Sequence, residues 1–120
     1  MRRGEIWTVG GAGDYAGKPR PAVILQDDRF DMTDSVTICA FTTDPTDAPL
    51  IRVAIKPSEV NGLRAACRLM VDKITTVRKS RLGVRVGRLA DEDIKRLNSA
   101  VLVFLGIASP NLRRRSADQS

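Results

Sequence analysis

Helical periodicity occurs in only one long segment of this 120-residue chain, and this restricts the possible folds more than any other feature. Residues 91–108 place apolar side chains three and four positions apart, after an acidic first turn that suits a helix N-terminus. The apolar stretches before it are short, rich in β-branched residues, and separated by Gly, Pro, Asn or Asp. We therefore expect an α+β fold, mostly β, in which one C-terminal helix follows a small, strongly twisted barrel.

Five or six strand-length segments precede that helix. One of them, 68–77, is expected to be a single long strand whose alternation sets Asp72 among the apolar neighbours Met70 and Ile74. A turn is expected at 58–62, with Asn61-Gly62 supplying positive φ. The expected strands are 4–9, 20–26, 36–43, 51–55, 68–77 and 84–89.

The expected domain spans residues 1–109, with a basic, disordered tail at 110–120 that begins where Pro110 ends the helix. Leu102, Val103 and Ile107 widen the apolar stripe of the helix beyond what one small core needs. Two explanations stay open, a homodimer contact and a helix deeply buried within its own chain.

The net charge of +6 and a sequence pI near 10.0 favour an anionic partner, although a solvated basic surface would give the same numbers. The chain contains no histidine, which removes the commonest general base and most zinc sites. No apolar segment is long enough for a membrane span, and no signal peptide is evident, so we expect a cytoplasmic protein without a membrane partner. The cysteines Cys39 and Cys67 are expected to be small buried hydrophobes.

The stretch Lys18-Pro-Arg-Pro is the strongest candidate for chemistry. Pro19 and Pro21 fix backbone φ at their own positions and push Lys18 and Arg20 into extended conformation. Arg20 is thereby held stiffly at the start of an apolar strand, which suits a guanidinium that binds phosphate. The alternative is a solvated arginine at a proline-bounded strand end. The glycine-rich segment 10–17 lacks nucleotide-binding spacing and is expected to be a flexible flap beside Arg20.

With these residues in view, the chain resembles the MazF/PemK/Kid family of bacterial toxins. The resemblance implies an SH3-like barrel of the CcdB/MazF type that forms a homodimer and cleaves single-stranded RNA at short sequences without a metal or cofactor. It also implies a cognate antitoxin whose acidic, disordered tail lies across the RNA groove, and DNA binding together with that antitoxin. The matching pieces, in order, are Arg3-Gly-Glu-Ile-Trp, the glycine loop, Arg20-Pro followed by Ala-Val-Ile-Leu-Gln, the strand end Thr42-Thr43, Leu69-Met-Val-Asp-Lys-Ile-Thr-Thr-Val, and Val86-Gly-Arg-Leu.

In such toxins an arginine before proline and a threonine at the end of the third strand carry the chemistry, which implies Arg20 and Thr42 here. The resemblance also implies a contribution from Asp72, which matches an acidic residue used in some branches. Pro19 stands where some members have histidine, and Met70 stands where PemK-like members have arginine, with Arg68 the nearest base.

Metal-free RNA cleavage uses the 2′-hydroxyl as nucleophile, so the protein must move protons and stabilise a charged phosphorane. The guanidinium of Arg20 can neutralise that charge through paired hydrogen bonds, and Thr42 can orient a phosphate oxygen. Asp72 is either a general base, whose pKa partial burial would raise, or a structural partner of a lysine or arginine. The expected substrate-binding residues are Lys18, Pro19, Tyr15, Thr43, Arg68, Arg78, Lys79 and Arg81.

Two other functions remain open at this point. One is a toxin on the same fold that poisons gyrase, as CcdB does, without nuclease activity. The other is a non-catalytic barrel that binds operator DNA, for which the basic charge alone is sufficient.

Overall fold

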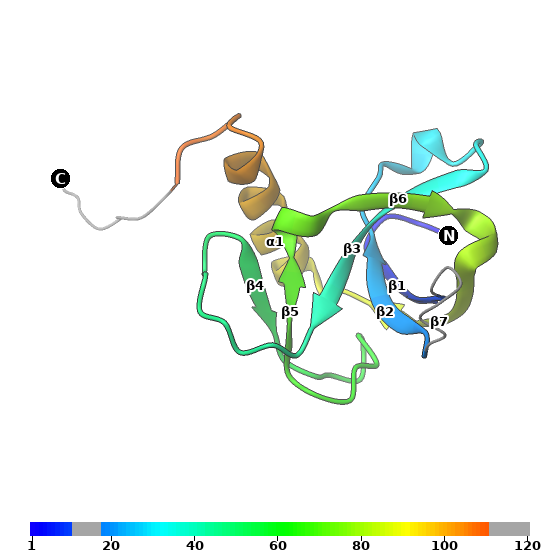
Figure 1. The fold of residues 1–120 in the computed structure, drawn as a ribbon, viewed down its shortest axis with the longest axis horizontal. Coiled ribbons are helices and arrows are strands. Elements are labelled where there is room, and N and C mark those ends of the chain that lie inside the picture. Colours follow the sequence, from blue (N-terminus) through cyan, green and yellow to red (C-terminus); the bar gives the residue numbers. More distant parts are fainter. Residues whose placement is uncertain (11–17, 111–120) are drawn as a thin grey trace, which may run out of the picture.

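The computed structural model describes residues 1–10 and 18–110, and Figure 1 shows a curved β-sheet with one helix beyond it. Three short 3-10 turns interrupt the strands: η2 (Asp28–Phe30), η3 (Val71–Lys73) and η4 (Lys79–Arg81). The helix is α1 (Asp91–Phe104). The strands are β1 (Glu5–Val9), β2 (Arg20–Ile24), β3 (Ser35–Thr42), β4 (Arg52–Ile55), β5 (Cys67–Met70), β6 (Thr75–Arg78) and β7 (Leu82–Arg88).

The strands pair in the order β4-β5-β3-β2-β1-β7, with β6 joined to β3 beside β5, and every pairing is antiparallel. The expected mostly-β fold with a C-terminal helix is confirmed, although the described residues form seven strands where five or six were expected. Because β3 pairs with β2, β5 and β6, it is the strand from which the sheet divides.

Two hydrophobic cores lie on opposite faces of this sheet, and β2 contributes to both. Val23 belongs to the larger core, which Leu97 of α1 completes, whereas Ala22 and Ile24 belong to a smaller core with Ile38. A strand buried on both faces reads as a continuous apolar run, which explains the sequence Ala-Val-Ile-Leu at this position.

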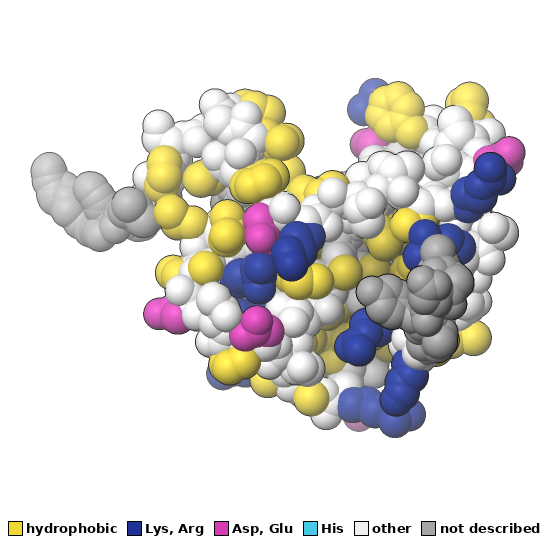
Figure 2. Space-filling view, viewed as in Figure 1, with side chains coloured by type: hydrophobic (Ala, Val, Ile, Leu, Met, Phe, Trp, Pro, Cys, Tyr) yellow, Lys and Arg dark blue, Asp and Glu magenta, His cyan; other side chains and the backbone are white. Residues whose placement is uncertain are grey.

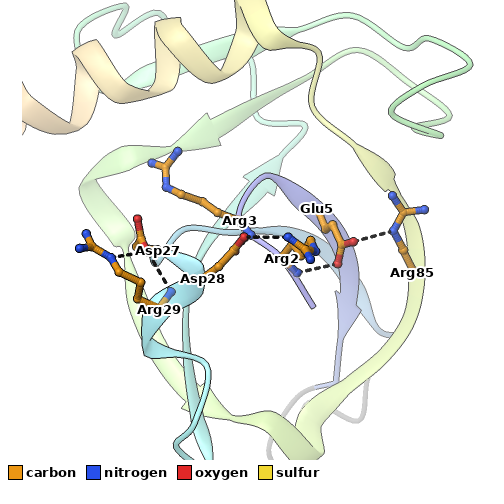
Figure 3. Close-up of polar contacts among 7 residues, drawn as sticks. All are labelled: Arg2, Arg3, Glu5, Asp27, Asp28, Arg29 and Arg85. Atoms are coloured by element: carbon orange, nitrogen blue, oxygen red, sulfur yellow. Dashed lines mark hydrogen bonds and ion pairs between the residues drawn. The ribbon is translucent and has the colours of Figure 1, made fainter.

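The N-terminal arginines fasten the start of the chain to the rest of the fold. Arg3 donates from Nε to the carbonyl of Leu25 (2.7 Å) and from Nη2 to Oδ1 of Asn98 in α1 (2.7 Å). Its backbone N–H donates to Asp28 at 2.7 Å, next to the ion pairs drawn in Figure 3. These bonds fix the end of β2 and the helix relative to β1.

The expectation of one long strand over 68–77 is wrong. β5 and β6 both pair with β3, but the turn η3 lies between them. The residues of this turn have no pairing partners on β3, so the two strands are separate. The turn keeps Val71 fully buried, and the Val71 N–H donates to the carbonyl of Ile51 at 2.9 Å. An apolar residue therefore continues the alternation through the turn, so the pattern conceals the break.

The helix ends earlier than the expected Ala108, because Gly106 stops it. Gly106 has φ +76, its N–H donates to the carbonyl of Val103 (3.0 Å), and the Ile107 N–H donates to the carbonyl of Leu102 (2.9 Å). These two bonds form a Schellman motif, which closes a helix with a left-handed glycine. The four large apolar side chains at this end are exposed: Leu102, Phe104, Leu105 and Ile107. Deep burial of the helix end within its own chain is therefore wrong.

Four smaller expectations concern a turn, the last strand, a membrane span and the C-terminal tail. Gly62 has the expected positive φ (+68), whereas Asn61 does not. The last strand begins at Leu82, earlier than expected. Within residues 1–10 and 18–110, no helix is long and apolar enough to cross a membrane. The expected tail at 110–120 falls almost entirely outside the described residues.

A candidate active-site cleft

Arg20 and Thr42 lie at neighbouring strand ends. β2 and β3 pair through Ala22 and Ala40, and continuing this register along both strands sets Arg20 across from Thr42. The Arg20 side chain is exposed, and Thr42 is half-buried. The hydroxyl oxygen of Thr42 accepts the Asp44 N–H at 3.1 Å, which leaves its own hydrogen available to donate.

Both residues line a cleft of about 520 Å³, here called the Arg–Thr cleft, a size typical of small-ligand sites. Pro19 and Thr43 line it as well, so four of the residues expected from the sequence lie together. Leu63, Val84 and Val86 add apolar surface to its lining.

A turn built around Asn61 shapes one rim of the Arg–Thr cleft. Asn61 is only 2% exposed, and its Oδ1 accepts the N–H groups of Ser58 (2.9 Å) and Leu63 (3.0 Å). Its Nδ2 donates to the carbonyl of Lys56 at 2.8 Å, so both the oxygen and the nitrogen of the buried amide have a hydrogen-bond partner. A Cβ at Gly62 would lie 2.2 Å from the Val86 carbonyl oxygen, so only glycine fits where this turn meets β7.

Two arginines that have no ion-pair partner in the described part of the chain line the cleft. Arg20 and Arg64 both line it, and neither forms an ion pair with a carboxylate among the described residues. Figure 2 shows Lys and Arg side chains around an apolar hollow near the ends of β2 and β7. Free guanidinium groups beside an apolar floor suit a ligand that carries both phosphate and flat apolar surface.

Asp72 does not line this cleft. In η3, it accepts Nε and Nη2 of Arg52 on its two oxygens, at 2.9 and 3.2 Å. Hydrogen bonding from Arg52 outweighs the opposing effect of burial and lowers the pKa of Asp72 below its ordinary value. The expectation that the pKa of Asp72 is raised toward that of a general base is therefore wrong. The structural pairing left open from the sequence is the arrangement observed.

The remaining expected substrate-binding residues divide into two groups. Lys18 and Arg81 line a second hollow on the other side of Arg20. Arg68, Arg78 and Lys79 line neither hollow: Arg68 donates to the carbonyl of Asp44 (3.2 Å), Arg78 is exposed on β6, and Lys79 forms an ion pair with Asp31 (3.0 Å). Tyr15 lies outside the described residues.

Comparison with known proteins identifies the family. Residues 2–105 match the model of the PemK-like, MazF-like toxins of type II toxin–antitoxin systems. The chain belongs to this family. The probable endoribonuclease MazF of Mycolicibacterium smegmatis is 57% identical to it over 108 residues, which cover 90% of this chain and 99% of that protein. The endoribonuclease MazF9 of Mycobacterium tuberculosis is 27% identical over 118 residues, covering 91% and 99% of the two chains. The resemblance stated from the sequence is confirmed.

Solved structures of MazF-like proteins share the fold of this chain. One, described as an endoribonuclease in complex with its cognate antitoxin from mycobacterial species, has a TM-score of 0.74 at 25% identity and covers 92% of this chain and 99% of its own. The Mycobacterium tuberculosis toxin MazF-mt6 has a TM-score of 0.73 at 22% identity, covering 87% and 98%, and supports the fold alone.

In this MazF-like chain, sequence reasoning missed several residues of the cleft. Arg64 and Cys67 both line it, but each follows an irregular turn, so no periodicity indicated where its side chain would lie. Both cysteines are free thiols, and burial raises the pKa of Cys39 to about 12. Cys39 is buried as expected, whereas Cys67 is only half-buried. Among the described residues, no group of three or more Cys, Asp or Glu is placed to hold a metal ion.

Proposed function

We propose that this chain is the toxin of a type II toxin–antitoxin system and cleaves single-stranded RNA at short, specific sequences without a metal ion. The observation that carries the proposal is that Arg20 and Thr42 lie at neighbouring strand ends and both line one cleft. The relatives named endoribonuclease MazF support the assignment of RNA as the substrate.

In the proposed reaction, the 2′-oxygen of the RNA forms a bond to the adjacent phosphorus, and the bond from phosphorus to the 5′-oxygen breaks. The 2′-hydroxyl loses its proton and the departing 5′-oxygen gains one, which leaves a cyclic phosphate and a 5′-hydroxyl end. Arg20 binds the phosphorane oxygens and stabilises the charge that develops on them. Thr42 donates its free hydroxyl hydrogen to a phosphate oxygen, an arrangement supported by the bond its oxygen accepts from Asp44.

The test is incubation of the purified protein with a long, unstructured RNA in EDTA, with Arg20→Ala as the matched variant. Because Arg20 is exposed at a strand end, we expect the variant to fold with a free energy of unfolding within about 0.5 kcal/mol of wild type. Discrete fragments with 5′-hydroxyl ends from the wild type alone would support the proposal. Intact RNA, or equal cleavage by both proteins, would contradict it and direct attention to gyrase or operator DNA.

The toxin is proposed to act in the cytoplasm as a homodimer held by a cognate antitoxin with an acidic, disordered tail, and to bind DNA together with that antitoxin. Leu102, Phe104, Leu105 and Ile107 give the end of α1 an exposed apolar surface that a second copy would cover. The cations around the Arg–Thr cleft complement an acidic tail. Light scattering of the wild type and of Leu105→Glu tests the dimer, and an unchanged mass for the variant would contradict this contact.

A further inference from the structure

Arg20 lines two hollows, of which the first is the Arg–Thr cleft. The second, here called the basic cleft, has a volume of about 480 Å³ and lies on the side of the smaller core. Its rim carries Lys18, Arg20 and Arg81, and its floor is formed by apolar residues that include Ala40 and Val77. No carboxylate is among the described residues that line it.

The orientation of Arg81 is fixed by two bonds to one residue. Its Nε donates to the Gly10 carbonyl at 2.9 Å, and its own carbonyl accepts the Gly10 N–H at 2.9 Å. These bonds use one guanidinium nitrogen and leave the two Nη groups without a hydrogen-bond partner among the described residues. None of the three rim cations forms an ion pair with a described carboxylate. Among the described residues, the rim therefore carries positive charge that no carboxylate neutralises, with Arg81 held in place by its bonds to Gly10.

A cationic rim above a largely apolar floor suits a nucleotide, whose phosphate would contact the rim and whose base would lie on the floor. Free phosphate would need only the rim. A duplex would keep its bases stacked away from the floor, so the occupant must be single-stranded.

We propose that the basic cleft binds the nucleotide on one side of the cleaved phosphate, while the Arg–Thr cleft binds the nucleotide on the other side. Arg20 is common to the two linings, so the phosphate that joins these nucleotides lies at Arg20. Arg81 is then a binding residue for the next phosphate along the strand, and the floor beside Thr75 contributes to sequence preference. This proposal rests on the proposed function and assigns the path of its substrate.

The first experiment measures binding separately from cleavage, with a single-stranded RNA whose nucleophilic 2′-hydroxyl is replaced by hydrogen. We expect Arg81→Gln to weaken binding about tenfold and to reduce the slope of log affinity against log salt by about 0.7, the value for one phosphate contact on a single strand. Arg81→Lys keeps the charge and should restore most of the slope. Lys95→Gln, an exposed charge on α1, is the matched control and should leave the slope unchanged.

The second experiment places a large side chain on the floor of the basic cleft. Thr75 and Thr76 are adjacent exposed threonines of β6, but only Thr75 lines the basic cleft. We expect Thr75→Phe to raise the KM for cleavage at least about fivefold with kcat nearly unchanged, and Thr76→Phe to leave both unchanged. An abasic nucleotide on one side of the cleaved bond should raise the KM of the wild type and of Thr76→Phe, but have little further effect on Thr75→Phe.

The outcomes separate this proposal from the proposed function. If Arg20→Ala abolishes cleavage while Arg81→Gln and Thr75→Phe behave as wild type, the basic cleft is not a nucleotide site and the nuclease assignment stands. Equal weakening by Arg81→Gln and Lys95→Gln would indicate a diffuse effect of net charge and would also overturn the proposal. If the wild type neither binds nor cleaves single-stranded RNA, both proposals fail. An acidic peptide bound in an Arg81-dependent manner would then identify the basic cleft as a protein-binding site.

Discussion

Replacing Thr42 tests the smallest element of the proposed mechanism, a single hydroxyl hydrogen. The Oγ1 atom accepts the Asp44 N–H at 3.1 Å, which orients the hydroxyl so that its hydrogen can reach a ligand in the Arg–Thr cleft. Thr42→Val keeps the shape and the β-branch but removes this donor. A lost donor to a developing oxyanion costs about 2.7–4 kcal/mol in transition-state stabilisation, so we expect kcat to fall roughly 10²- to 10³-fold.

The stability of the Thr42→Val variant should change little. Thr42 is half-buried, and the Asp44 N–H that loses its acceptor is exposed and can bond to water. We expect the free energy of unfolding to remain within about 1 kcal/mol of wild type. A loss of rate with retained stability would therefore report on chemistry rather than on folding.

The assay is single-turnover cleavage of a short RNA, measured for wild type, Thr42→Val and Thr42→Ser, with urea unfolding of each protein at the same concentration. Thr42→Ser keeps the hydroxyl and should retain cleavage within about tenfold of wild type. A Thr42→Val rate within about threefold of wild type would show that the hydroxyl contributes nothing to the transition state, and would refute this reasoning.

Three further predictions concern the stability of the fold and the reactivity of its thiols. Asp72→Asn should lower thermal stability at pH 7 and spare cleavage by the folded protein. Because folding lowers the pKa of Asp72, the stability gained from its carboxylate is present above the pKa of the unfolded chain and is lost as pH falls through the pKa of the folded protein. Melting curves of the variant and the wild type should therefore converge in acid. Equal stability with lost cleavage would instead assign Asp72 to the chemistry. Gly62→Ala should lower the free energy of unfolding by at least about 2 kcal/mol, since its Cβ would clash with a backbone carbonyl at positive φ, whereas Gly106→Ala, at positive φ in open space, should cost about 1 kcal/mol in urea unfolding. Equal costs would contradict the clash. Under native conditions a thiol reagent should modify Cys67 well before Cys39, whose buried thiol has a pKa of about 12, and mass spectrometry of partly labelled protein would show the order.

Those features of the fold that depend on local pattern could be predicted from the sequence. The run Ala22–Leu25 indicated a central strand, and the acidic turn at Asp91 indicated the start of the helix. The register of β5 and β6 along β3 could not be predicted from the sequence. The turn η3 separates the two strands, but its buried Val71 preserves the alternation expected of one continuous strand. Pro110 predicts a later helix end than the structure has, because the left-handed conformation of Gly106 terminates the helix first.

The candidate site was predictable to the extent that its residues sit at strand ends. Arg20 and Thr42 each belong to a strand that the sequence indicated. The two residues therefore lie close to each other once β2 pairs with β3. The partner of Asp72 did not follow, because Arg52 is distant in sequence and meets it only through the β4–β5 pairing and η3. The turn around Asn61 was recognised, but its approach to β7, which brings Leu63 into the cleft wall, is a tertiary contact without a local signal.

The division of the core explains why one arginine serves both clefts. Alternating side chains of β2 enter opposite cores, so the end of this strand is a point where the openings of both cores lie within reach of one side chain. Pro19 and Pro21 restrict the backbone at this point, which fixes where the Arg20 side chain leaves the strand, between the Arg–Thr cleft and the basic cleft. In the proposed path, the RNA places one phosphate at Arg20 and the adjacent nucleotides on either side. Specificity would then arise from two separate pockets and catalysis from the residue between them, so variants that alter sequence preference need not alter the chemical step.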